Sequence, residues 1–183
     1  MWDKYYKEGF KWIYFEALKE RRSVRAYKDE QIKDEELNKI LEAGEYAASG
    51  MGKQSPIMIV VQDKETIAQL SKMNAKVFGK EGIDPFYGAP TVVIVLADKN
   101  MPTCVEDGSL VMGNLMNAAY GLGVGSCWIH RAKEEFESEE GKALLKKWGV
   151  EGDYIGVGHC ILGYAKDEPK PAAPRKEGYV VRV

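Results

Sequence analysis

Hydrophobic side chains recur along the chain with two periods, and these periods predict alternating helices and strands. Apolar residues three or four positions apart predict helices over 10–22, 34–48, 64–79, 140–149 and from 105 to the glycines at 121–125. Short uninterrupted apolar runs predict buried strands over 57–61, 91–97, 126–129, 154–165 and 179–183. The alternation contains no internal repeat, so it indicates a single domain over residues 1–183.

The C-terminal end of the chain departs from this pattern. Residues 167–178 are rich in proline, which keeps them out of a helix or a central strand. The strand predicted over 179–183 follows directly and has no room to fold back as a hairpin. An extended arm of this kind reaches outward. We therefore expect residues 173–183 to form an arm that adds a strand to the sheet of a second copy.

Composition and charge narrow the possible functions. The chain carries 26 Lys and Arg against 28 Asp and Glu, a net charge of −2, which argues against a nucleic-acid binder. No stretch approaches the roughly 20 apolar residues that cross a bilayer, so no membrane segment is expected. Cys104, Cys127 and Cys160 form no metal-ligand pattern and suit a reducing compartment. These features predict a cytoplasmic protein without a metal site.

A local basic cluster stands out against this mildly acidic background. Arg21, Arg22, Ser23 and Arg25 end the first predicted helix and begin the segment after it. Guanidinium forks and a hydroxyl match a phosphate, and alternate residues 21, 23 and 25 share one face if the chain is extended. The alternative is that these basic residues only offset the helix dipole. A second basic pair, Arg175-Lys176, is either solvated or completes a phosphate clamp.

Two glycine-rich stretches are further candidates for ligand contact. The loop over 49–56 lies between a helix and a strand, and its glycines allow a ligand to approach the backbone. A plain connection is the alternative. The stretch from Gly121 to Ser126 follows a helix and precedes a strand, which is the wrong order for a dinucleotide-binding fingerprint. Gly125 could instead let the backbone lie against a flat ring.

Aromatic and histidine residues give weaker signals. Phe86 and Tyr87 lie in the long loop over 79–90, where they either line a substrate pocket or anchor the loop to the core. His130 and His159 have no Ser or Cys partner in a triad-like pattern. His159 falls inside a predicted strand and is expected to be structural.

These motifs, in this order, resemble those of the FMN-dependent nitroreductase family over nearly the whole length. The matching stretches are RRSVRAY, AGEYAASGMGKQSP, APTVVIVLAD, DGSLVMGNLMNAAYGLGVGSCWI and GYAKDEPKPAAPRK. The resemblance implies an α+β fold with a mixed central sheet flanked by helices. It also implies a homodimer that exchanges its C-terminal strands and holds one FMN in each of two interface sites.

The resemblance further implies which residues contact FMN. The first basic motif would hold its phosphate and ribityl end through Arg21, Ser23 and Arg25, with Arg22 as a further candidate. The loop of the second subunit would meet the flavin through Ala48, Ser49, Gly50, Met51, Gly52 and, nearby, Gln54. The segment beside the ring would contribute Gly125, Ser126, Trp128 and His130. A second phosphate clamp would come from Arg175 and Lys176.

An enzyme of this kind uses NADH or NADPH to reduce nitroaromatics, quinones or similar electron-poor acceptors by ping-pong hydride transfer. Since the chemistry belongs to FMN, no catalytic residue of the chain is assigned. Enone reduction, dehalogenation and non-enzymatic flavin binding are the alternatives. The sequence departs from many members at Gly52, where they have Asn, and at Ser55-Pro56, where they have Pro-Trp.

Overall fold

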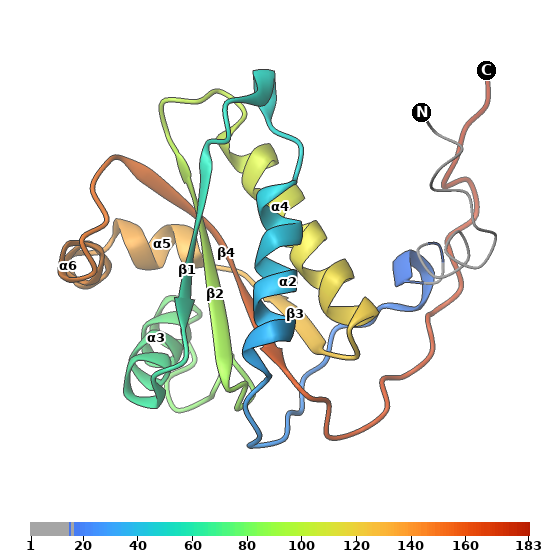
Figure 1. Cartoon of the computed structure of the whole chain (residues 1–183), viewed down its shortest axis with the longest axis horizontal. Helices are drawn as coiled ribbons and strands as arrows, with labels where there is room; N and C mark the ends of the chain where they lie inside the picture. The colour runs from blue at the N-terminus through green and yellow to red at the C-terminus, as the bar shows by residue number, and fades with distance from the viewer. Residues whose placement is uncertain (1–14, 16) are drawn as a thin grey trace.

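The computed structural model describes residue 15 and residues 17–183, and these fold around one four-stranded sheet (Figure 1). The strands are β1 (Pro56–Val61), β2 (Thr91–Asp98), β3 (Gly125–Ile129) and β4 (Tyr154–Gly163), in the spatial order β1-β2-β4-β3. Their three pairings are all antiparallel. The sheet is therefore antiparallel rather than mixed. Within the described residues, the only parallel pairing is an isolated bridge between Ser23 and Ser126.

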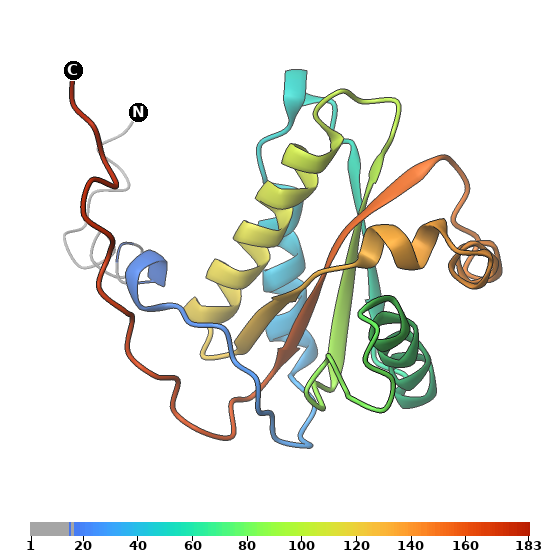
Figure 2. The same ribbon diagram turned by 180° about the vertical axis from the view of Figure 1, so that it is seen from behind.

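Helices cover both faces of the sheet (Figures 1 and 2). On one face lie α2 (Asp34–Glu45) and α4 (Cys104–Gly121). On the other lie α3 (Lys64–Val77), α5 (Ala132–Glu137) and α6 (Glu139–Lys147). A short 3-10 turn, η2 (Gly50–Gly52), precedes β1. This layering of helices on an antiparallel sheet is an α+β architecture.

Strand β2 explains why the sequence shows an uninterrupted apolar run. Its residues 91–97 are all buried. Because successive side chains of a strand point to opposite faces, Val92, Ile94 and Leu96 pack in the core beneath α3 and α5. The residues between them, Val93, Val95 and Ala97, pack in the core beneath α2 and α4. A strand covered on both faces has no polar side to give it an alternating pattern.

Capping side chains fix the N-terminal ends of α3 and α6, and a glycine allows the close packing of α4 on the sheet. The Asp63 carboxylate accepts the Thr66 N–H at 2.8 Å and caps α3, and the Ser138 hydroxyl accepts the Gly141 N–H at 3.1 Å and caps α6. Gly108 allows α4 to pack closely on β4. A Cβ at this position would lie 2.5 Å from Val157 Cγ2, too close for any other residue without a shift.

Most of the predicted elements are present, and three differ. Residues 15 and 17–20 are helical and the helix ends before Arg21, while residues 10–14 and 16 of the predicted helix lie outside the described residues. Helix α5 was not predicted. The predicted strand over 179–183 does not form in the single chain, where these residues are exposed and unpaired. The exchange of this strand between two copies stays a prediction.

None of the helices in the described part of the chain is both long enough and apolar enough to span a bilayer.

Candidate functional site

The basic cluster lies along β3, the strand at one edge of the sheet. The Val24 N–H donates to the Ser126 carbonyl at 2.9 Å, next to the parallel bridge between Ser23 and Ser126. The chain then runs on beside the end of β4, where the Lys28 N–H donates to the Tyr164 carbonyl at 2.9 Å. Figure 2 shows this segment crossing in front of β3. Two stretches about 100 residues apart in sequence are thereby brought together, as the hypothesis of a shared ligand site requires.

Three buried polar atoms at this junction, Arg21 Nη1, Arg22 Nε and Ser126 Oγ, lack partners among the residues that the structure describes. A buried polar group without a partner is costly, so such groups usually have a ligand, water or ion to satisfy them. A guanidinium and a hydroxyl are both donors to an anion. Their chemistry therefore fits the phosphate end of FMN.

The charge of Arg21 also reaches β4. Burial, and then the neighbouring Cys127, raise the pKa of the Cys160 thiol, while the Arg21 guanidinium acts in the opposite direction. Cys160 thus stays a neutral thiol in the core. A buried, neutral thiol of this kind is unreactive.

Arg22 and Arg25 have different surroundings. Arg22 Nη1 donates to the carbonyls of Lys19 at 2.7 Å and Arg21 at 2.6 Å, and Arg22 Nη2 lies 3.7 Å from Glu20. Arg22 therefore satisfies carbonyls at the end of its own helix, which is the helix-end role considered for the cluster. Arg25 is exposed. Arg22 Nε is buried without a partner among the described residues, but Arg22 Nη1 is held by the two carbonyls. Arg21 and Arg25 are therefore the stronger candidates for ligand contact.

Two of the four residues predicted to lie beside the ring, Gly125 and Trp128, are packed against other parts of the chain. A Cβ at Gly125 would lie 2.9 Å from Val24 Cγ2, so this glycine is explained by the approach of the basic segment. The Trp128 indole lies over Gly158, where a Cβ would come within 2.3 Å of Trp128 Nε1. His130 is exposed just after the end of β3. Of these four residues, Ser126, with its unpartnered hydroxyl, and the exposed His130 are the ones left open to a ligand.

The predicted flavin-contacting loop lies at the opposite end of the sheet (Figure 1). Pro56 pairs with Ala97, and Ala97 with Ile155, whereas Ser126 pairs with Leu162, seven residues further along β4. At roughly 3.4 Å per residue the two candidate regions are about 24 Å apart along the strands. Loop residues Ala48, Ser49 and Gln54 line a small cavity of about 170 Å³ beside Val111. Within one chain, the loop and the basic cluster cannot contact the same FMN.

The second basic pair lies in the C-terminal arm. Arg175 and Lys176 are exposed, and the arm runs away from the sheet (Figures 1 and 2). Arg175 Nε donates to the Ala173 carbonyl at 3.2 Å, and Lys176 Nζ lies 5.3 Å from the centre of the Tyr179 ring. The structure therefore does not bring this pair to Arg21 within one chain.

The two aromatic candidates of the 79–90 loop have separate environments. Phe86 is fully buried, and its ring centre lies 5.1 Å from that of His159, so it anchors the loop to the core and does not line a pocket. Tyr87 is 41 % exposed with φ of 55°. A cavity of about 910 Å³ lies between this loop and α3, lined by Ile67, Ser71 and Pro90 among others. It includes none of the residues expected to hold FMN.

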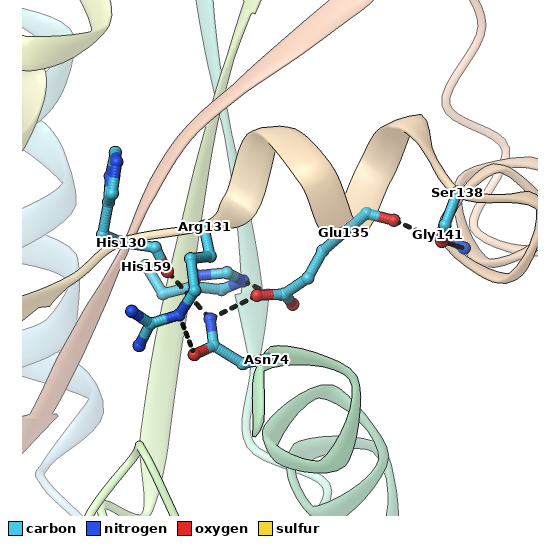
Figure 3. Close-up of polar contacts among 7 residues, drawn as sticks. All are labelled: Asn74, His130, Arg131, Glu135, Ser138, Gly141 and His159. Atoms are coloured by element: carbon cyan, nitrogen blue, oxygen red, sulfur yellow. Dashed lines mark hydrogen bonds and ion pairs between the residues drawn. The ribbon is translucent and has the colours of Figure 1, made fainter. Parts of the chain in front are cut away.

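A buried polar network, which the sequence did not predict, fixes the end of β3 (Figure 3). The Asn74 side-chain amide on α3 donates hydrogen bonds to the His130 carbonyl at 2.8 Å and to the Glu135 carboxylate. Its carbonyl oxygen accepts a hydrogen bond from Arg131 Nε at 3.0 Å. Glu135 Oε2 lies 3.3 Å from His159 Nε2, without hydrogen-bond alignment. His159 is therefore structural, as expected. The network holds the backbone from which His130 projects.

We expect Glu135→Ala to lower the free energy of unfolding by about 3 kcal/mol, because it removes the buried carboxylate that accepts from Asn74 and leaves a cavity beside His159. Urea unfolding followed by circular dichroism measures the change. Glu137→Ala, an exposed position on the same helix, is the control and should change stability by less than about 0.5 kcal/mol. Equal stability of the two variants would contradict this view of the network.

Comparison with known proteins identifies the family. The model of the Nitroreductase family matches residues 18–164. The chain belongs to the Nitroreductase family. A relative from Archaeoglobus fulgidus, provisionally named NADH dehydrogenase/NAD(P)H nitroreductase, is 35% identical over 153 residues, which cover 81% of this chain and 83% of that protein. The residues 18–164 that match the family model include the basic cluster, the loop and β3.

Solved structures give the same result for the fold. A nitroreductase with bound FMN from Bacteroides fragilis superposes with a TM-score of 0.85 at 31% identity, covering 93% of this chain and 98% of that one. A nitroreductase with bound FMN from Desulfitobacterium hafniense gives a TM-score of 0.84 at 26% identity with the same coverage. The α+β nitroreductase fold predicted from the sequence motifs is confirmed.

Proposed function

We propose that this chain reduces nitroaromatics, quinones or similar electron-poor acceptors with electrons from NADH or NADPH, in a ping-pong order. Its enzyme class is that of an FMN-dependent NAD(P)H oxidoreductase. FMN is the cofactor, as in the structural relatives that contain it. The observation that carries the proposal is the set of unpartnered buried donors, Arg21 Nη1, Arg22 Nε and Ser126 Oγ, at the junction of the basic cluster and β3.

The roles of this chain's residues follow from their positions. When bound, FMN supplies the two-electron chemistry, and the protein supplies binding and orientation. In the proposal, Arg21, Ser23 and Arg25 bind the phosphate and ribityl end, assisted by Arg175 and Lys176. Gly125, Ser126, Trp128 and His130 border the ring. Positive charge from Arg25 would stabilise negative charge that develops at the edge of the ring during reduction.

The proposed site is completed by a second copy of the chain. Its loop, with Ala48, Ser49, Gly50, Met51, Gly52 and Gln54, would reach the flavin held by the first copy. Support comes from apolar side chains that stand exposed around α2 and α4, including Tyr46 at 82 %, Met51 at 78 % and Leu110 at 50 %. The arm over 173–183, whose valines are exposed, would add its strand to the partner's sheet.

The assembly in the proposal is therefore a homodimer with two FMN sites, each built from both subunits. Residues 1–183 act as one domain in it. The partners are a second copy of the chain and small electron acceptors. The cytoplasm is the proposed location, because the three free thiols suit a reducing compartment.

Anaerobic titration tests the proposed function. Purified protein should carry about one FMN per chain, lose its yellow colour when NADH or NADPH is added without oxygen, and regain it with a quinone or a nitroaromatic. Comparing a panel of acceptors would separate nitroreduction from enone reduction and dehalogenation. Flavin that binds but is not bleached by either nicotinamide would overturn the proposal in favour of a flavin carrier.

A further inference from the structure

A buried carboxylate on α4 holds the loop that precedes β1. Asp107 lies in the first turn of α4 and is only 2 % exposed. No pattern in the sequence connects Asp107 with the loop, which is more than 50 positions earlier. Acidic side chains are seldom fully buried without partners, so the groups that Asp107 binds indicate its role.

Both oxygens of Asp107 bind this loop. Oδ1 accepts the Gly50 N–H at 2.8 Å, and Oδ2 accepts the Ser55 hydroxyl at 2.6 Å. Gly50 begins the η2 turn and Ser55 directly precedes β1, so one carboxylate fixes both ends of the segment. The Ser55 hydroxyl depresses the pKa of Asp107, and the Gly50 N–H acts in the same direction. The carboxylate is therefore charged at neutral pH, and both hydrogen bonds are charge-assisted.

The residues between these two anchors are exposed and unusual in backbone conformation. Met51, Gly52 and Gln54 have φ of 54°, 67° and 52°. Left-handed backbone at non-glycine residues persists only where the surroundings determine it. Inside the loop, the Ser49 hydroxyl accepts the Gln54 N–H at 2.9 Å. Gly50 packs so closely on Thr103 that a Cβ would lie 2.2 Å from Oγ1. The anchors at the ends therefore set the shape of the exposed tip.

We propose that Asp107 is a positioning residue, which holds residues 50–55 in the shape needed to contact the FMN of the partner subunit's site. This inference rests on the proposed function. Asp107 itself does not contact the flavin. It ties the loop to α4, so the position of α4 in the assembly determines where the loop meets the cofactor.

Asp107→Ala, Asp107→Asn and Ser55→Ala test the proposal in the full-length protein. Amide hydrogen exchange of the FMN-free protein reports on the loop directly, because the Gly50 N–H is bound by Asp107. Fluorescence titration with FMN reports on the site. The control is Glu106→Gln, which removes the same charge from the exposed neighbouring position.

We expect Asp107→Ala to speed amide exchange at Gly50 and to weaken FMN binding by about tenfold or more. The thermal midpoint of unfolding should change little. Asp107→Asn keeps a carbonyl acceptor for Gly50 and should restore both readouts to within about threefold of wild type. Ser55→Ala removes one of the two bonds and covers the case in which Asp107→Ala does not fold. Glu106→Gln should match wild type.

If amide exchange at Gly50 in the variants equals that of the wild type, Asp107 does not hold the loop. If exchange is faster but FMN affinity is unchanged, the loop held by Asp107 does not contribute to FMN binding. Failure of the wild-type protein to bind FMN would refute the proposed function instead. In that case the exchange data would still decide whether Asp107 holds the loop.

Discussion

Replacing Arg21 and Arg25 together by alanine is expected to leave a folded protein that no longer retains FMN through purification. Arg21 presents a buried Nη1 that no described residue satisfies. Arg25 is exposed, four residues further along the same segment. Each charge-assisted hydrogen bond to a phosphate contributes about 1.5–3 kcal/mol, so losing two should weaken binding by at least about 100-fold. Stability should fall little, because the removal of Arg21 also removes a buried donor without a partner.

The control for this double variant removes the same charge elsewhere. Lys72 and Lys76 are exposed on α3, on the opposite side of the sheet from α2 and α4. Lys72→Ala with Lys76→Ala should retain wild-type flavin content, measured by absorbance after gel filtration. Arg22→Ala should also retain FMN, because Arg22 is engaged with the carbonyls of Lys19 and Arg21. Full flavin in the Arg21/Arg25 variant would refute the phosphate clamp.

The sequence predicted the positions of the four strands, but not that all their pairings are antiparallel. Strand β2 appears as a continuous apolar run because helices cover both of its faces, whereas the edge strand β1 is only partly buried. Helix α5 was missed for the opposite reason. It has six residues, and its buried face contains Glu135 beside Ala132 and Phe136. A buried glutamate interrupts the apolar pattern, and only the contact with Asn74 explains why it is there.

The candidate site could be predicted only in part. The basic cluster was visible as a local excess of arginine, but its contact with Ser126 joins segments far apart in sequence. Alternation along an extended segment indicated only that Arg22 faces away from Arg21. The contact of its side chain with the Lys19 carbonyl is seen only in the structure. The role of Asp107 could not be predicted, because a single acidic residue in the first turn of a helix usually interacts with the helix dipole. Its two bonds to the loop are tertiary.

The two halves of each proposed FMN site belong to different chains, and this division predicts complementation between variants. About 24 Å of sheet separates the basic cluster from the 48–54 loop, so the account assigns them to different subunits of each FMN site. Two variants, each defective in one half, should then complement each other. Arg21→Ala with Arg25→Ala damages the phosphate half. Gly50→Val damages the loop, because any Cβ at this position meets Thr103.

Each variant alone should form dimers with little flavin, since both of its sites contain one damaged half. In a mixed dimer, one site combines both damaged halves and the other combines both intact halves. Random reassortment makes about half of all dimers mixed, so the mixture should bind about one FMN per two dimers. Differently tagged subunits allow the mixed dimers to be isolated, and these should bind about one FMN each.

Flavin stoichiometry of the isolated mixed dimer therefore tests the central claim, that each FMN site of this nitroreductase-family protein is built from two chains. We expect about one tightly bound FMN per mixed dimer and near zero for either variant alone. Mixed dimers with no more flavin than the parent variants, or a Gly50→Val protein that keeps two FMN per dimer, would contradict it.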